Sequence, residues 1–295
     1  MFSSLRFLKW RIGHPQRDRL RRDVISWIAT RPDDPELQEV AAFLEKNAPT
    51  YLPYDFACAQ QDNPVHVELD RATGLPVIDH GGKRLFWREG RKTKRIPRDY
   101  NALLAEQDPR SPHRYLTGDF DIAPGDVLVD AGSAEGILTL DVIDRVGHAY
   151  LFEADPRWTR ALEATFAPWK DKVTIVPKYV GDETRDDMVR LDDYFGPERR
   201  IDFLKLDVEG WESRVLEGAR EMLTSGRVAR AAVCAYHYPQ DEEQLSALLR
   251  DMGFDVETSD RYMLLYRDEG LAPPYLRRGL LRATRPERAE RAERA

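Results

Sequence analysis

The sequence predicts an α/β fold, in which helices cover a mostly parallel sheet that is closed by an antiparallel C-terminal hairpin. Two observations carry this prediction. From residue 126 onward, short and nearly continuous apolar runs alternate with segments of helical periodicity, as expected for parallel strands that are buried on both faces. The last two runs, residues 254–257 and 262–266, are separated only by residues 258–261. A connection that short cannot be a parallel crossover.

The first part of the chain, residues 1–117, predicts an α+β extension that could serve as a substrate cap. Residues 1–50 are expected to be helical, because apolar side chains recur at helical spacing on both sides of Pro35. Residues 51–95 predict a short antiparallel meander with turns at 73–76 and 81–82. A further helix is expected within residues 97–117.

Residues 118–268 form the predicted Rossmann-like domain. Its expected parallel strands are residues 127–131, 149–153, 173–176, 201–206 and 231–236. Asp155 followed by Pro156 is a typical helix start, and Gly226 and Gly253 are typical helix ends. Residues 269–295 are rich in proline and arginine, end in Glu-Arg-Ala repeats, and are expected to be disordered.

The composition and net charge of the chain limit the kinds of molecule that it is expected to bind. The chain has 295 residues, a net charge of −7 and a pI near 5.5, which gives no general electrostatic reason to bind nucleic acid. No apolar run is long enough to span a membrane. Residues 1–22 are basic with interspersed aromatic residues, which fits either a weak membrane-surface contact or a solvated helix packed on its own domain. Cys58 and Cys234 lie in apolar runs, so we expect buried thiols in a reducing, cytoplasmic location.

The first chemical motif follows the first predicted parallel strand and runs from Asp130 to Gly136. Gly132 and Gly136 allow a sharp turn and a close approach of the backbone to a ligand. Ala134 replaces the second glycine of the dinucleotide-binding G-x-G-x-x-G pattern. A carboxylate at Asp130 suits a cationic cofactor better than a pyrophosphate. The alternative is a strand-to-helix turn without a ligand.

Glu153 ends the next predicted strand, 21 positions after Gly132. A carboxylate at this place can accept both hydrogen bonds of a ribose diol. Nicotinamide dinucleotides and S-adenosylmethionine (SAM) share that diol, so Glu153 indicates a nucleoside cofactor without choosing between them. The alternative is that Glu153 and Asp155 only cap the following helix.

Asp207, Glu209 and His237 are the candidate catalytic residues. The two carboxylates follow a central strand, and His237 follows the fifth strand, so all three are expected at the carboxyl edge of the sheet. His237 could take a proton from a substrate hydroxyl, with Asp207 or Glu209 orienting it. The alternatives are helix capping for one carboxylate and a backbone partner for the histidine. A metal site that includes Asp241 is conceivable, but the spacing matches no metal motif, and no metal ligand is predicted.

Residues 106–115, just before the first parallel strand, are dense in polar and aromatic side chains. Such a segment suits a lid over an acceptor pocket, and His113 and Arg114 are its candidate substrate-binding residues. A polar loop without that role is the alternative.

Several of these segments, in order, resemble the FkbM family of SAM-dependent methyltransferases. The resemblance rests on residues 130–136, 152–153, 191–194, 203–212 and 215–219, and its most specific part is residues 205–210 with the glycine and alanine at 218–219. It extends from about residue 125 to 266. Proteins of this family methylate hydroxyl groups of small natural products or saccharides. The resemblance implies SAM contacts along the turn from Asp130 through Gly132 and Ser133 to Gly136. It also implies contacts at Glu153 and, with the adenine amine, at Asp182.

The sequence therefore predicts a SAM-dependent O-methyltransferase that acts on a small molecule or a saccharide. Two alternatives stay open. One is a non-catalytic nucleotide-binding α/β module. The other is a nicotinamide-dependent oxidoreductase, which the missing second glycine and the expected terminal hairpin disfavour.

Overall fold

The computed structural model describes residues 11–268 and 270–286, so the first part of the basic N-terminal segment lies outside the described residues. The chain forms two compact units. The first unit consists of residues 1–65, 94–114 and 258–280, and the second of residues 66–93, 115–257 and 281–295. These boundaries differ from the expected division at residue 117, because residues 66–93 pack with the sheet.

The described residues of the first unit are mainly helical, as expected for residues 11–50 and for the helix within residues 97–117; residues 1–10 lie outside the described part of the chain. The helices of this unit whose bounds lie within the described residues are α2 (Pro15–Ala29), α3 (Pro35–Lys46), α4 (Asp55–Gln60) and α5 (Ile96–Glu106). The carboxylate of Asp34 caps α3 by accepting from two backbone N–H groups. The Tyr54 hydroxyl ties the C-terminal segment to these helices, because it accepts from the Tyr262 N–H at 2.8 Å and donates to the Tyr262 carbonyl at 3.0 Å. Helix α4 was not expected from the sequence.

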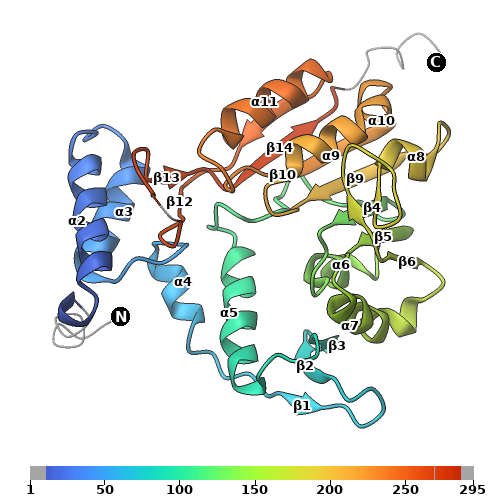
Figure 1. The fold of residues 1–295 in the computed structure, drawn as a ribbon, viewed down its shortest axis with the longest axis horizontal. Helices are drawn as coiled ribbons and strands as arrows, with labels where there is room; N and C mark the ends of the chain where they lie inside the picture. Colours follow the sequence, from blue (N-terminus) through green and yellow to red (C-terminus); the bar gives the residue numbers. More distant parts are fainter. Residues whose placement is uncertain (1–10, 269, 287–295) are drawn as a thin grey trace. The chain divides into compact units, whose positions relative to one another are not determined.

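The second unit is built on a seven-stranded sheet (Figure 1). From one edge to the other, its strands are β11 (Asp255–Thr258), β14 (Leu280–Thr284), β10 (Val228–Cys234), β9 (Ile201–Leu206), β4 (Val127–Ala131), β5 (His148–Phe152) and β6 (Val173–Val176). The five strands from β10 to β6 are parallel, and the C-terminal pair adds the antiparallel element. The predicted Rossmann-like fold class is confirmed.

The prediction that residues 254–257 and 262–266 pair with each other as a hairpin is wrong. β11 has β14 as its neighbour in the sheet. β12 (Met263–Leu264) is not part of this sheet and pairs antiparallel with β13 (Leu276–Arg277) in the first unit. The short spacing excluded a parallel crossover correctly, but it could not show that a later segment supplies the antiparallel strand.

The expectation of a disordered tail is also wrong for residues 276–284. These residues form β13 and β14, and Leu280, Leu281 and Ala283 are fully buried. The Pro- and Arg-rich composition of this segment predicted disorder, although it contains a short apolar strand. The side chains of that strand are buried only by contacts in the tertiary structure. Residues 287–295 lie outside the described part of the chain.

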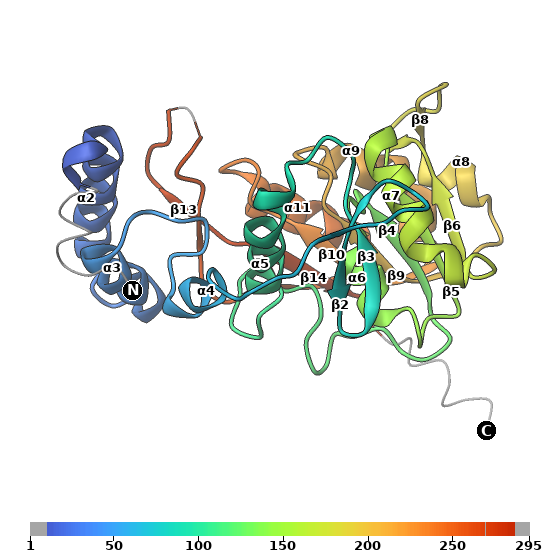
Figure 2. The same cartoon turned by 90° about the horizontal axis from the view of Figure 1, so that it is seen from below.

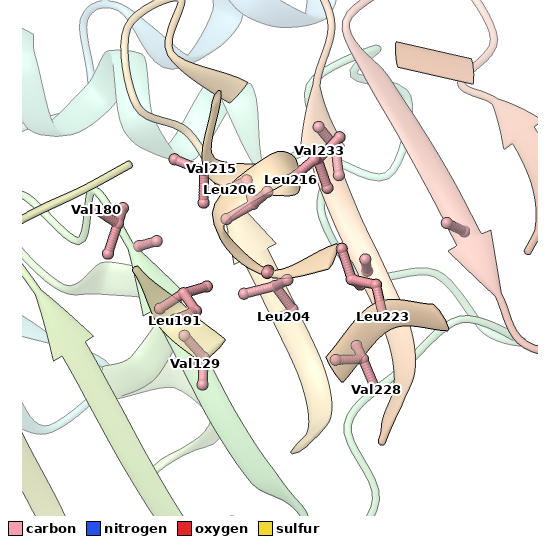
Figure 3. Close-up of a cluster of buried hydrophobic side chains, with 14 of the residues drawn as sticks. Val129, Val180, Leu191, Leu204, Leu206, Val215, Leu216, Leu223, Val228 and Val233 are labelled. Carbon is pink, nitrogen blue, oxygen red and sulfur yellow. The ribbon is translucent and has the colours of Figure 1, made fainter. Parts of the chain in front are cut away.

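One face of the sheet carries a large hydrophobic cluster (Figure 3). Leu204 and Leu206 of β9 lie there with Val215 and Leu216, and all four are at most 1% exposed. The helices that contribute to this cluster are α8 (Leu191–Phe195), α9 (Glu212–Gly218), α10 (Arg220–Thr224) and α11 (Asp241–Asp251). Burial of one such side chain contributes about 1.5–3 kcal/mol, so this face is firmly held.

The remaining helices of this unit are α6 (Ile137–Val142) and α7 (Pro156–Phe166), the latter followed by the 3-10 helix η2 (Ala167–Trp169). A small antiparallel sheet of β1 (Glu68–Leu69), β2 (Pro76–His80) and β3 (Lys83–Phe86) lies beside α7 (Figure 2). Thr165 accepts a hydrogen bond from the Phe86 N–H at 3.0 Å. The expected meander is confirmed, and it is part of the sheet unit.

Two short strands, β7 (Tyr179–Val180) and β8 (Met188–Val189), pair in parallel after β6. Among the described residues, no helix combines the length and the apolar character needed to cross a bilayer.

Candidate functional site

A cavity of about 550 Å³ opens at the carboxyl ends of β4, β5 and β9, within the range typical of small-molecule sites. Ligands of doubly wound sheets bind at this edge. The cavity is lined by Gly132, Ala134, Phe152, Glu153, Ala154, Trp158, Lys178, Tyr179, Val180, Arg185, Met188, Asp207, Val208, Glu209 and Trp211. All of these residues belong to the sheet unit.

The turn after β4 is packed against the end of β9. Gly132 has φ +74°, and a Cβ atom there would lie 1.9 Å from the carbonyl oxygen of Asp207. Both the conformation and the space therefore require glycine. Ala134 also has a positive φ, +45°, and its N–H donates to Glu153 at 2.9 Å. This turn presents its backbone to the cavity, as the sequence predicts for Gly132.

Asp130 does not line the cavity but lies beneath the turn, with 1% of its surface exposed. Its carboxylate accepts from the Thr139 hydroxyl at 2.8 Å and faces the Lys205 ammonium at 3.1 Å. Lys205 also donates to the carbonyl of Gly132 at 2.7 Å. Burial lowers the pKa of Lys205, but the Asp130 and Asp207 carboxylates outweigh it and hold that pKa above its usual range. The buried pair thus holds the turn from below.

Other residues of the expected cofactor set lie outside the lining of the cavity. Ser133 is buried, and its N–H donates to the carbonyl of Phe152 at 3.2 Å. Gly136 packs on α7, where a Cβ atom would lie 2.7 Å from Leu162. Asp182 is exposed and lies 3.8 Å from the Arg214 guanidinium. Helix packing therefore accounts for Gly136 without a ligand.

Glu153 lies on the cavity wall, where the sequence predicts it. One carboxylate oxygen accepts from the N–H of Ala134 and the other from the N–H of Asp155, at 2.9 and 2.8 Å. Each carboxylate oxygen has a further lone pair, so both can still accept from a ligand. Burial raises the pKa of Glu153. Asp155 caps α7 through the N–H of Arg157, which leaves Glu153 to the cavity.

Asp207, which lines the cavity, is held by two tyrosines. Tyr115 donates to one of its oxygens at 2.8 Å, and Tyr236 donates to the other at 3.2 Å. Burial and the Asp207 charge raise the pKa of Tyr115 well above its usual range, so this phenol stays a donor. Asp207 is therefore oriented by hydroxyl groups, and the sequence alone did not point to them.

His237 lies among three carboxylates. Its Nε2 atom is 3.7 Å from both Asp207 and Glu209, and its Nδ1 atom is 3.2 Å from Glu212. The expected grouping of His237, Asp207 and Glu209 is thus present in the structure. Burial lowers the pKa of His237, but the carboxylates, Glu212 foremost, raise it by more, and the net shift is upward.

Donor atoms of Asp207, Glu212 and His237 lie within 4.8 Å of one another, a spacing that a cation could bridge. The two ring nitrogens face different carboxylates, however, which is the arrangement of an ion-paired imidazole. Asp241 is occupied elsewhere, because it accepts from the Tyr238 N–H at 2.6 Å. We assign no metal ligands here.

His113 and Arg114 belong to the first unit. Arg114 donates to the Gln107 carbonyl at 2.9 Å, within the same segment. Their expected role in binding the acceptor stays a prediction.

The structure adds functional candidates that sequence reasoning missed. Lys205 and Glu212 stand within the segments that carry the family resemblance, but neither was given a role there. Tyr115 lies in the segment 106–115 that the sequence marks as a candidate lid, but its contact with Asp207 depends on the tertiary structure. The exposed aromatic residues of the cavity wall, Tyr179 and Trp211, carried no signal in a single sequence, because exposed aromatic residues are common and their grouping is tertiary.

The fold and the cavity define a Rossmann-like α/β protein with a cavity of small-molecule size at the carboxyl edge of its sheet. Its sequence matches the family described as "Methyltransferase FkbM domain" over residues 37–256. The chain belongs to the FkbM family of SAM-dependent methyltransferases, with S-adenosyl-L-methionine as cofactor. The family match begins well before residue 125, so it includes part of the N-terminal extension in which no family resemblance was expected.

The individual proteins that the chain resembles share only a short segment or a low sequence identity with it. A segment of 76 residues is 37% identical to ribosomal RNA small subunit methyltransferase A of Corynebacterium efficiens, covering 24% of this chain and 26% of that protein. The FkbM methyltransferase structure from Methylobacillus flagellatus is similar at 17% identity and a TM-score of 0.47, covering 64% of this chain and 52% of that one. A precorrin-6y C5,15-methyltransferase from Geobacter metallireducens is similar at 12% identity and a TM-score of 0.40, covering 56% and 84%. The chain thus spans about a quarter of the first relative and about half of the second.

Proposed function

We propose that this protein is an O-methyltransferase that transfers a methyl group from SAM to a hydroxyl group of a small molecule or a saccharide. The observation that carries the proposal is the position of His237. It lies within 3.7 Å of Asp207 and Glu209, which line the cavity, so a base stands beside the proposed cofactor site. An oxygen nucleophile has a proton to lose, and a histidine can accept it near neutral pH.

In this proposal the cofactor lies along the cavity wall. Gly132 and Ala134 let the backbone approach it closely, and Glu153 accepts hydrogen bonds from the ribose hydroxyls. Asp130 acts indirectly, since its carboxylate holds Lys205 and Lys205 holds the carbonyl of Gly132. Ser133 and Gly136 are also buried, so in this proposal they support the turn without touching the cofactor. We propose no contact for Asp182, because it is exposed and paired with Arg214.

SAM supplies an electrophilic methyl group on its sulfonium when it is bound. The protein must then hold the acceptor oxygen in line with that methyl group and keep water away. Asp207, held by two tyrosine hydroxyls, is placed to orient the acceptor or His237. Trp211, which is 41% exposed and lines the cavity, offers a flat apolar face to an acceptor ring.

The test has a binding part and a turnover part. Calorimetry with SAM, S-adenosylhomocysteine and NAD separates a methyltransferase from an oxidoreductase. Incubation with radiolabelled SAM and panels of saccharides, hydroxylated natural products and RNA then separates an enzyme from a non-catalytic binding module and identifies the class of acceptor.

We expect the label in an O-methyl group of a small molecule or a saccharide. We also expect His237→Ala to lower turnover at least 100-fold while the Kd for SAM stays within a factor of two. Transfer of the label to RNA, or full turnover in the His237→Ala variant, would refute this proposal.

A further inference from the structure

His237 has one ring nitrogen beside a buried carboxylate and the other beside two carboxylates that line the cavity. Nδ1 lies 3.2 Å from Oε1 of Glu212, whose side chain is only 2% exposed. Nε2 lies 3.7 Å from Oδ1 of Asp207 and from Oε2 of Glu209, both of which line the cavity. The imidazole side chain is itself 11% exposed. The two ring nitrogens are therefore in different surroundings.

Glu212 is held rigidly where it faces His237. It is the first residue of α9, and the carboxylate oxygen that faces Nδ1 also accepts from the Val208 N–H at 2.9 Å. A carboxylate that is buried and already bonded to the backbone cannot easily turn away. It favours a proton on Nδ1, because an N–H donated to it satisfies both groups.

We propose that Glu212 is the positioning residue of the site: it fixes the orientation and the tautomer of His237, so that the Nε2 lone pair faces the acceptor hydroxyl. This inference rests on the proposed O-methyl transfer. In that step the acceptor O–H bond breaks and its proton goes to Nε2. A new C–O bond forms while the C–S bond breaks, and the electron pair of that bond stays on sulfur. Nδ1–H remains paired with Glu212, which stabilises the imidazolium that forms.

The charges around His237 determine how its protonation responds to pH. The carboxylates that face the ring are Glu212 on α9 and Asp207 and Glu209 after β9, and the ring of Tyr236 lies 4.2 Å away. Glu209 is 93% exposed, so solvent screens it, and Glu212 has the strongest influence of the three. A base whose pKa is raised becomes active at a higher pH than an unperturbed histidine.

Glu212→Gln is the sharpest perturbation. The glutamine oxygen still accepts from the N–H of Val208, and the side-chain volume is nearly unchanged, so only the charge is lost. We expect kcat to fall 10- to 100-fold, the rising limb of the kcat–pH profile to move to lower pH, and the Kd for SAM to stay within a factor of two. The matched control is Glu217→Gln on the same helix, which removes an exposed carboxylate paired with Arg220 and should change neither quantity.

A second readout is independent of turnover. Long-range ¹H–¹⁵N NMR of the ¹⁵N-histidine protein, assigned with a His237→Asn variant, reports the tautomer and the pKa of His237. We expect the Nδ1–H tautomer above the pKa in the wild-type protein and a lower pKa in Glu212→Gln. A predominant Nε2–H tautomer in the wild-type protein would overturn the inference, and so would an unchanged pKa in the variant.

The wild-type measurement remains decisive if Glu212→Gln fails to fold. If no methyl transfer is detected at all, the proposed function fails, whereas the NMR result still decides whether Glu212 positions His237.

Discussion

Replacing Lys205 by methionine should destabilise the sheet unit strongly, because it strips a buried carboxylate of its charge partner. Asp130 and Lys205 are paired in register on neighbouring strands, and both side chains are at most 5% exposed. Methionine is similar in length but offers neither the charge nor the donor. Asp130 would keep only the hydrogen bond from Thr139. Removing one partner of a buried ion pair costs about 3–5 kcal/mol.

The change should be measured as the free energy of unfolding in urea, followed by tryptophan fluorescence. A loss of this size also lowers Tm by about 6 °C or more, at about 2–4 °C per kcal/mol for a unit of this size. The affinity for SAM should fall as well, since Lys205 holds the carbonyl of Gly132 at 2.7 Å. Lys83→Met is the matched control. It breaks an ion pair with Asp144 of which the aspartate is 68% exposed, and should cost about 1 kcal/mol or less.

A double variant separates the lost charge pair from lost packing. Asp130→Asn combined with Lys205→Met leaves a neutral amide that can still accept from the Thr139 hydroxyl. We expect this double variant to recover much of the stability that Lys205→Met loses. A loss below 1 kcal/mol for Lys205→Met, or a double variant no more stable than it, would refute the reasoning.

The other predictions concern the same loop and cavity. Burial raises the pKa of Glu135 to about 7. Because this pKa lies above the value in the unfolded chain, the folded state loses stability as pH rises from about 4.5 to about 7. The Glu135→Gln variant should therefore match the wild-type stability at pH 4.5 and exceed it by up to about 3 kcal/mol at pH 8. An equal difference at both pH values in urea titrations speaks against this account. Gly132→Ala should lower SAM affinity at least tenfold by calorimetry, because its Cβ would collide with the carbonyl of Asp207. The control is Gly74→Ala, which also lies at positive φ but in open space; it should cost only about 1 kcal/mol of stability and leave SAM binding unchanged. Glu153→Gln should weaken SAM binding about tenfold by removing a charge-assisted acceptor, and an unaltered Kd would remove Glu153 from the proposed site.

Much of the fold could be predicted from the sequence because its signals are local. Strands β4, β6 and β9 begin and end at the expected residues, since each is a short apolar run between turn residues. Asp207, Glu209 and His237 could be placed at one edge of the sheet, because parallel strands bring their carboxyl ends together. Their grouping in the structure agrees with that expectation.

The misplaced elements depend on contacts between distant residues. Periodicity shows that residues 280–284 are partly apolar, but not that they enter the sheet between β11 and β10. The same limit applies to Asp130. A carboxylate at the end of a strand looks available for a ligand until the register places Lys205 beside it.

The sequence by itself therefore determined the class of fold, the order of the parallel strands along the chain and the edge at which chemistry is placed. Apolar periodicity and turn residues are sufficient for these, because they act within a few residues. The tertiary structure decided which strand closes the sheet, which carboxylate faces each nitrogen of His237, and which polar side chains are buried. Strand register and side-chain direction control these contacts, and they are established only when segments far apart in the chain pack together.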